Sequence, residues 1–308
     1  MSAIAMPQRR TQSLPEAVIQ GGAGEQLRAW LVLTKFRISS VSTLTAAMGY
    51  IAAAGTLRFG LISTLTGTLC LAMAASALNE IAERDLDARM RRTSARPIPS
   101  GRISVAAARA GALVLVSAGV AVLYLFHGGV TAVLGLLAVF WYNGLYTPMK
   151  RISAFAVVPG SVIGALPPAI GWAAAGGDLE SPALLSLCFV FFVWQVPHFW
   201  LLALRHKDDY EQAGFPTLSV YFTPDQIHRL IFTWTASSVA ACALLWVFQA
   251  IQGWVAVAAI GVSGVWLLLR FRKAFEVSAG STWLFRAFMD INRFALVLMV
   301  AVVFDALV

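Results

Sequence analysis

Acidic and basic side chains gather between residues 78 and 102 of a chain in which only 12% of residues are charged. If a helix that begins near Gly60 continues through this stretch, Asn79, Glu83 and Asp87 lie one turn apart along one stripe. Oxygen ligands on one stripe form half of a site for a hard cation. Mg²⁺ is usually held by one or two carboxylates while waters and substrate phosphates complete its coordination. The spacing therefore favours a metal–diphosphate site.

A different interpretation is a solvated loop whose acids and arginines pair with one another, which is the usual role of a charge run. Here, however, the run directly follows an apolar span, and ionisable residues at membrane depth or at its edge are functional by default. The position along the chain therefore favours the functional interpretation. We expect the helix to end near Thr93 and a structured loop to follow, because two prolines and a glycine come next.

A second polar stretch ends the sixth apolar run, at residues 194–218. Gln195 and His198 lie in an apolar helix that we expect to break at Pro197, and His198 is either a hydrogen-bonded structural residue or a functional one. Asp208 and Asp209 follow at the inner end of this helix. Two acidic walls that face each other would repel unless cations lie between them, so the two stretches predict a metal-bridged polyphosphate in one gap.

Aromatic and basic residues also gather at residues 141–151, the end of the fourth span. Tyr142 and Tyr146 with Lys150 and Arg151 are typical of an aromatic belt with positive-inside anchors. Beside a diphosphate, the two basic residues would instead form an anion clamp, because cations there stabilise the charge that develops on the leaving group.

The elements that position these residues are membrane-spanning helices. The mean hydropathy of +0.75 and repeated apolar runs of about 20 residues predict an all-α, polytopic membrane bundle. The expected spans are Ile38 to Ala54, Leu61 to Ile81, Val105 to Phe126, Val130 to Tyr146, Ala154 to Ala175, Pro182 to Leu204, Leu230 to Ala250, Trp254 to Leu269 and Phe294 to Val308. The fifth should be kinked, because it is rich in proline and glycine.

The basic residues set the orientation. With the N-terminus inside, every Lys and Arg except Arg58 falls in an inside segment, so the net charge of +8 reflects topology and not nucleic-acid binding. We therefore expect residues 1–33 to form a mobile cytoplasmic arm, residues 34–308 to form one transmembrane domain, and the C-terminus to lie on the opposite side. The three cysteines lack metal or disulfide spacing and are expected to be buried free thiols.

Four motifs in order carry a family resemblance. They are Asn79, Glu83 and Asp87 with the following RMRRTSARPIPSGRIS, YTPMKR at 146–151, WQVPHFW at 194–200, and DDYEQAGFP at 208–216. Together they resemble the UbiA superfamily of intramembrane prenyltransferases, and within it they are most similar to the protohaem IX farnesyltransferase branch. The resemblance runs from about Thr34 to the end of the chain.

The resemblance implies a helical bundle around a central cavity and Mg²⁺-bound farnesyl diphosphate under a cytoplasmic cap, with Asn79, Glu83 and Asp87 as the first metal motif. Glu83 stands where the family usually has Asp. Of the second motif, Asp, three residues, Asp, only Asp208 and Asp209 remain, in the acid-Asp-Tyr pattern of the haem branch. The implied reaction transfers farnesyl to a vinyl group of protohaem IX with addition of water.

Individual roles follow from the same resemblance. Tyr146 would steady the allylic cation, His198 would contact haem or handle the proton of water, and Arg96 or Arg102 would meet the haem propionates. The catalytic set comprises Asn79, Glu83, Asp87, Tyr146, Lys150, His198, Asp208 and Asp209. The substrate-binding set comprises Arg84, Arg91, Arg96, Arg102, Lys150, Arg151, Gln195, His198 and Tyr210.

The implied location is a bacterial plasma membrane. The implied partners are farnesyl diphosphate, protohaem IX and membrane lipid, with haem A synthase or a terminal oxidase as further candidates and no nucleic acid. Two alternatives stay open: a prenyltransferase for a quinone-type aromatic acceptor, and a transporter that binds haem or isoprenoid without chemistry, since broken spans are also typical of transporters.

Overall fold

The computed structural model describes residues 22–272 and 281–308, and all regular elements within these residues are helices. The long helices are α1 (Ala23–Leu33), α2 (Phe36–Ala54), α3 (Gly60–Asp87), α4 (Val105–His127), α5 (Gly129–Phe140), α8 (Val162–Ala174), α9 (Pro182–Arg205), α11 (Pro224–Ala241), α13 (Trp254–Arg272) and α14 (Ser281–Leu307). The short ones are η1 (Trp141–Tyr146), α6 (Thr147–Met149), η2 (Ala154–Ala156), α7 (Val157–Gly160), α10 (Lys207–Gln212), η3 (Leu218–Val220) and α12 (Ala243–Val247).

Eight helical segments of the described chain are long and apolar enough to cross a membrane. This confirms the prediction of an all-α polytopic membrane protein. The remaining expected span corresponds to α2, which has 19 residues and a first half rich in serine and threonine. That α2 also crosses the bilayer stays a prediction, as does the central cavity.

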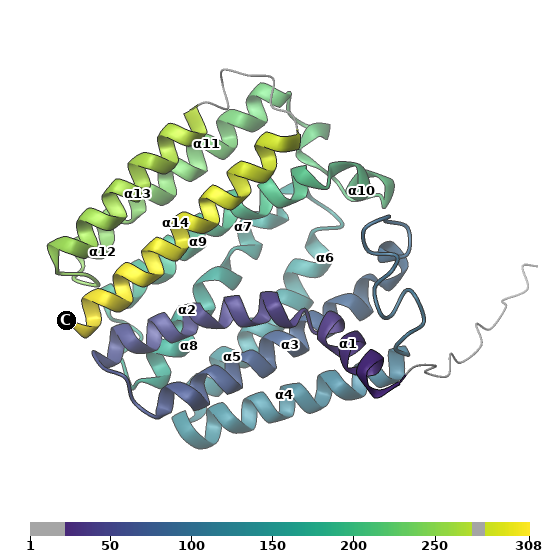
Figure 1. Cartoon of the computed structure of the whole chain (residues 1–308), viewed down its shortest axis with the longest axis horizontal. Coiled ribbons are helices and arrows are strands. Elements are labelled where there is room, and N and C mark those ends of the chain that lie inside the picture. Colours follow the sequence, from purple (N-terminus) through teal and green to yellow (C-terminus); the bar gives the residue numbers. More distant parts are fainter. Residues whose placement is uncertain (1–21, 273–280) are drawn as a thin grey trace, which may run out of the picture.

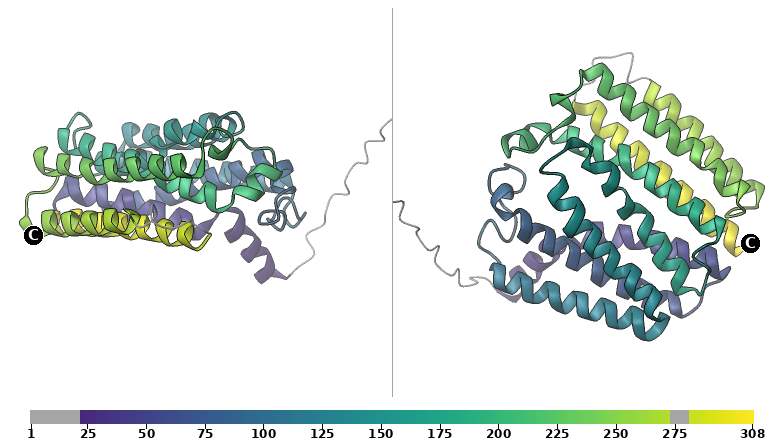
Figure 2. Two further views of the ribbon diagram at one scale, coloured as in Figure 1. Left: turned by 90° about the horizontal axis from the view of Figure 1, so that it is seen from above. Right: turned by 180° about the vertical axis from the view of Figure 1, so that it is seen from behind.

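The helices form two groups that lie close together at one end of the molecule (Figures 1 and 2). One group contains α2, α3, α4, α5 and α8, and the other contains α9, α11, α13 and α14. They are joined where α8 packs on α9 and where α14 packs on α2. Toward the other end the ribbons diverge, and that end carries α10 and the α3–α4 loop, residues 88–104. The candidate site lies at this diverging end.

Glycines allow the closest helix contact, between α2 and α8. A Cβ atom at Gly171 would overlap the carbonyl oxygen of Ala46, and one at Gly49 would overlap the backbone of Pro168. Such small residues let membrane helices approach closely. The expected fifth span is broken as predicted: a turn at Ser161 separates α7 from α8.

The ends of several helices can be compared with the sequence. Ser104 caps α4, because its side chain accepts a hydrogen bond from the backbone N–H of Ala107. The prediction that the third helix ends near Thr93 was wrong, since α3 ends at Asp87 and turns follow. The expected break at Pro197 was also wrong: α9 continues through it, because a membrane helix tolerates the loss of one N–H where neighbours satisfy the freed group.

Helix α1 packs against α3 and α4 at one end of the first helix group. Ala29 and Leu33 are buried in one cluster with Ala77 and Ile81 of α3 and with small residues of α4. The last eleven residues of the expected arm, residues 23–33, therefore form a packed helix. Residues 1–21 lie outside the described residues.

Candidate functional site

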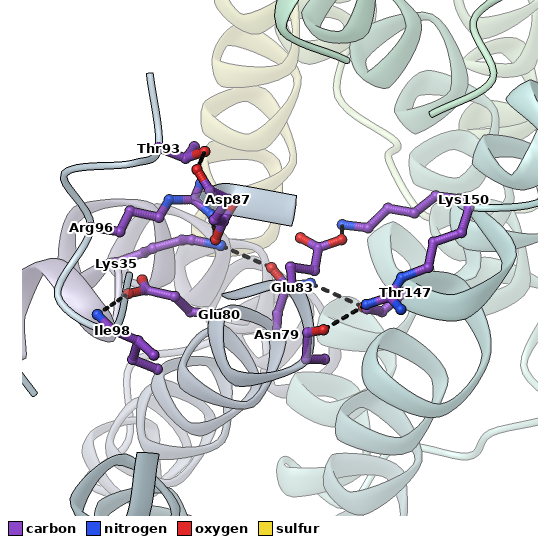
Figure 3. A network of polar contacts seen from close by, with 12 residues as sticks. Lys35, Asn79, Glu80, Glu83, Asp87, Thr93, Arg96, Ile98, Thr147 and Lys150 are labelled. Atoms are coloured by element: carbon purple, nitrogen blue, oxygen red, sulfur yellow. Dashed lines mark hydrogen bonds and ion pairs between the residues drawn. The ribbon is translucent and has the colours of Figure 1, made fainter. Parts of the chain in front are cut away.

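The stripe on α3 faces the protein interior. Asn79, Glu83 and Asp87 are 2%, 5% and 0% exposed, although they lie in the last turns of a helix whose C-terminus reaches the diverging end (Figure 3). Asp85, which the helical geometry turns away from them, has a largely exposed side chain that pairs with Arg84. Buried carboxylates need partners that offset the loss of water.

Each polar side chain of the stripe contacts one cation, and the three cations come from three different segments. Lys35, between α1 and α2, donates from Nζ to Asn79 Oδ1 at 3.2 Å. Lys150, after α6, places Nζ 2.6 Å from Glu83 Oε1. Arg96 of the α3–α4 loop donates from Nη1 to Asp87 Oδ2 at 2.6 Å. The acidic stripe is thus enclosed by positive charge.

The electrostatic environment differs between the two lysines. Burial lowers the pKa of the Lys150 ammonium, but the Glu83 carboxylate together with Tyr142 and Tyr210 more than reverses this, so the pKa lies above its usual value. Burial lowers the pKa of Lys35 to about 8, and the positive charges of Arg96 and Lys150 act in the same direction. Lys35 therefore lies where cations repel one another, whereas Lys150 is held by its carboxylate.

A further carboxylate, Glu80, lies beside the stripe and fixes the loop above it. Glu80 is fully buried, and its Oε1 accepts a hydrogen bond from the backbone N–H of Ile98 at 3.1 Å. Thr93 Oγ1 donates to the backbone oxygen of Asp87 at 2.9 Å. These bonds and the Arg96–Asp87 pair hold the α3–α4 loop against the end of α3, as Figure 3 shows.

Asn79 is oriented from its other side by a π-helical segment. Its Nδ2 donates to Thr147 Oγ1 at 3.1 Å, and that hydroxyl donates to the backbone oxygen of Tyr142 at 2.8 Å. Residues 141–146 form η1, a π-helix, and such segments are frequent at functional sites. The arrangement turns Asn79 Oδ1 toward Lys35 and the acidic side chains.

A row of rings runs from the acidic stripe along α9. Lys150 Nζ lies 5.5 Å from the ring centre of Tyr146. The ring of Tyr146 stacks on Phe199 at 5.4 Å between centroids, and Phe199 lies 5.7 Å from His198. His198 also contacts the ring of Phe288 from α14, at 4.9 Å. The row thus connects Lys150, beside the acidic stripe, to His198.

The second acidic stretch packs against the end of the first. Tyr210 and Phe215 belong to one apolar cluster with Leu86 and Met90, so α10 lies against the turn that follows α3. Asp208 is exposed and Asp209 is half-buried. Within the described parts of the chain, His, Cys, Asp and Glu do not form a group of three that could hold a metal ion by themselves. The two stretches share one edge, but a ligand set that closes around an ion would need substrate oxygens.

Of the other predicted substrate-binding residues, the arginines lie around this edge, whereas Gln195 lies further along α9, beside Gly164 of α8. Arg102 bonds within its own loop, to Ser100 and to the backbone oxygen of Ala95. Arg151 donates to the backbone oxygen of Ala82 at 2.5 Å. Arg84 and Gln195 are half-buried, and Arg91 is exposed.

Sequence reasoning missed Lys35, Glu80 and Thr147. Glu80 belongs to the charged stretch but lies off the stripe of i, i+4 spacing, and Thr147 lies inside the YTPMKR motif without a charge to mark it. Lys35 was counted only as a basic residue at the inner end of a span, and a lysine there usually extends toward the lipid headgroups.

An all-helical membrane chain with buried carboxylates, cations and a ring row at one membrane edge belongs to the class of membrane-embedded enzymes. The sequence model of the UbiA prenyltransferase family matches residues 41–292. The chain belongs to this family and is therefore a prenyltransferase.

Its curated relatives include protoheme IX farnesyltransferases. The protein of Oleidesulfovibrio alaskensis is 44% identical over 245 residues, which cover 78% of this chain and 86% of the relative. The protein of Rhodopseudomonas palustris strain BisB5 is 36% identical over 279 residues, covering 88% and 87%.

Solved structures share the fold at low identity. A UbiA homologue from Archaeoglobus fulgidus, solved with GPP and Mg²⁺, has a TM-score of 0.68 at 15% identity and covers 91% of this chain and 99% of its own. A digeranylgeranylglyceryl phosphate synthase structure has a TM-score of 0.74 at 12% identity, covering 92% and 99%.

Proposed function

We propose that this chain transfers the farnesyl group of farnesyl diphosphate to a vinyl group of protohaem IX, with addition of water, and so forms haem O for terminal oxidase assembly. The relatives named protoheme IX farnesyltransferase over most of their length support the substrates. The observation that carries the chemistry is the buried stripe of Asn79, Glu83 and Asp87 enclosed by cations, which suits a metal-bound diphosphate.

The donor set fits Mg²⁺. Glu80 Oε2 and Asp87 Oδ1 are buried oxygens without a hydrogen-bond partner in the described structure, and buried acceptors of this kind need a ligand or an ion. Oxygen ligands from carboxylates and an amide are the type that Mg²⁺ prefers. Asn79, Glu83 and Asp87 would hold the ion, with Asp208 and Asp209 on the opposite wall. Bound Mg²⁺ would neutralise the diphosphate and make it a better leaving group.

The chain's own residues then act on the two ends of the farnesyl diphosphate. Lys150 and Arg96 bind diphosphate oxygens, with Arg151 beside them, and stabilise the charge that the diphosphate gains when the allylic C–O bond breaks. The electron pair of that bond leaves with the diphosphate. The ring faces of Tyr146 and Phe199 lie beside Lys150 and would stabilise the allylic cation.

The acceptor side of the reaction forms one C–C and one C–O bond. The terminal vinyl carbon of haem bonds to the farnesyl carbon, the oxygen of water bonds to the inner vinyl carbon, and the proton of that water must leave. His198 lies at the far end of the ring row, and its Nδ1 is buried without a hydrogen-bond partner in the described chain. We assign it to the haem, as a direct contact or as acceptor of this proton. Of the two arginines considered for the haem propionates, Arg102 is the remaining candidate, because Arg96 is assigned to the diphosphate.

The membrane of action is the bacterial plasma membrane, with the site at its cytoplasmic edge and the C-terminus on the opposite side. The distribution of Lys and Arg supports this orientation. A haem A synthase or a terminal oxidase would be the next partner, because it uses the product.

Pigment extraction tests the proposal. Membranes that express the chain should convert haem B into a species that is heavier by one farnesyl group and one hydroxyl group, in which one vinyl has become a hydroxyethylfarnesyl group, and a His198→Ala variant should lose this product. Prenylation of a quinone-type aromatic ring in place of haem would favour the acceptor alternative. Binding of haem or isoprenoid without Mg²⁺-dependent release of diphosphate would favour a transporter.

A further inference from the structure

Lys35 occupies a position in the site that its place in the sequence does not predict. Its backbone is left-handed, with φ 46° and ψ 45°, and it separates α1 from α2. Residues other than glycine adopt this conformation rarely and at an energetic cost, and they do so most often at functional sites. Here the kink turns the side chain away from the headgroup region and into the polar network of Figure 3.

Lys35 is one of three cations that contact the polar stripe on α3. The charged groups of the site are three buried carboxylates and three half-buried cations: Glu80, Glu83, Asp87, Lys35, Arg96 and Lys150. Each of the proposed metal ligands on α3 contacts one of these cations, and for Asn79 that cation is Lys35. The cations thus stand where a metal ion would stand, and they approximately balance the charge of the carboxylates.

This balance of charge affects how Mg²⁺ can bind. Mg²⁺ that entered alone would add positive charge to a site that is already near neutral, and it would be repelled by the cation that contacts each ligand. A prenyl diphosphate carries more negative charge than one Mg²⁺ neutralises, so the two together leave the site near balance. The displaced cations then have diphosphate oxygens to bind.

We propose that Lys35 is a diphosphate-binding residue: it holds Asn79 Oδ1 until the metal takes that oxygen, and then binds the diphosphate. Lys35, Arg96 and Lys150 exchange carboxylate and amide partners for phosphate partners, so Mg²⁺ and the diphosphate enter together. This inference rests on the proposed function only in requiring a prenyl diphosphate. It does not depend on the acceptor.

The test measures binding, without turnover, on the purified full chain in lipid nanodiscs. Isothermal titration gives the affinity for Mg²⁺ alone and, at saturating Mg²⁺, for farnesyl thiodiphosphate, which resists ionisation. Lys35→Met should bind the thiodiphosphate about tenfold or more weakly, as expected for a lost hydrogen bond to a charged group, and should bind Mg²⁺ alone more tightly. Lys35→Arg should recover much of the thiodiphosphate affinity.

Arg37→Met is the matched control, because Arg37 is an exposed cation two positions further along. It should change neither affinity. Unchanged thiodiphosphate affinity in Lys35→Met would overturn the proposal, as would an equal loss of both affinities, which a merely structural lysine would cause. Wild-type protein that binds no thiodiphosphate would refute the proposed function itself.

A second measurement needs no variant and covers the case in which Lys35→Met does not fold. The proposed exchange of cation partners predicts that Mg²⁺ and diphosphate bind cooperatively to the wild-type chain. Mg²⁺ should bind at least about tenfold more tightly in the presence of inorganic diphosphate than alone, and the affinity for diphosphate should rise by the same factor in the presence of Mg²⁺. Independent binding of the two would contradict the exchange.

Discussion

The pair formed by Lys150 and Glu83 permits a quantitative prediction. The two side chains are only 16% and 6% exposed, and Nζ and Oε1 are 2.6 Å apart. Removing one partner of a buried ion pair typically costs about 3–5 kcal/mol, because the other charge stays buried without compensation. Lys35 is also near the Glu83 carboxylate and compensates part of its charge, so we expect Lys150→Met to lower the free energy of unfolding by about 3 kcal/mol.

A double variant separates the interaction energy of the ion pair from the contributions of the two individual side chains. Glu83→Gln in the Lys150→Met background removes the uncompensated charge, so the double variant should be more stable than the sum of the two single losses predicts, by at least about 1.5 kcal/mol. Denaturant unfolding of the purified chain, followed by tryptophan fluorescence, gives the four free energies. Turnover should fall about a hundredfold in Lys150→Met, because a cation beside the leaving group is lost.

Lys207→Met is the matched control for stability. Lys207 pairs with Glu211 at 3.7 Å on the surface, where both side chains are about two-fifths exposed, and such pairs contribute about 0–1 kcal/mol. Additive losses in the Lys150 and Glu83 cycle, or a loss in Lys150→Met no larger than that of the control, would refute the reasoning that the pair is buried and coupled.

Three further predictions concern the ring row, a helix terminus and the metal. Gly160→Ala should reduce turnover by displacing the Tyr146 ring, because a Cβ atom at this position would overlap that ring. Gly261→Ala is its control and should leave turnover unchanged, because the space around its Cβ is open. Equal rates in the two variants would exclude a role for the ring position. Asp305→Ala should lower stability by about 1–2 kcal/mol but spare turnover, because its carboxylate accepts hydrogen bonds at 2.7 and 2.6 Å from the N–H groups of residues 252 and 253, ahead of α13. Chelation of divalent metal should abolish diphosphate release and added Mg²⁺ should restore it, which phosphate detection can follow; release that persists in chelator would argue against a metal-bound diphosphate.

Much of the architecture follows from local patterns in the sequence. Hydrophobic runs long enough for a bilayer predict the helices, because a chain in lipid must satisfy its backbone groups within each segment. The spacing of Asn79, Glu83 and Asp87 predicts one stripe because α3 continues through Asp87. The capping of α4 by Ser104 is equally local, since the bond spans only three residues.

Contacts between distant segments were decided by the tertiary structure alone. Lys35 lies 44 positions from Asn79, and Thr147 lies 68 positions from it, so no periodicity relates them. The direction of the Lys35 side chain depends on a left-handed backbone, which the sequence does not indicate because this position holds neither glycine nor asparagine. Which cation contacts a given buried oxygen depends on how several helices pack, because their packing decides which cation lies within reach of that oxygen. For this reason the sequence was sufficient to predict the polar stripe on α3, whereas the cation that contacts each of its side chains could be assigned only from the folded chain.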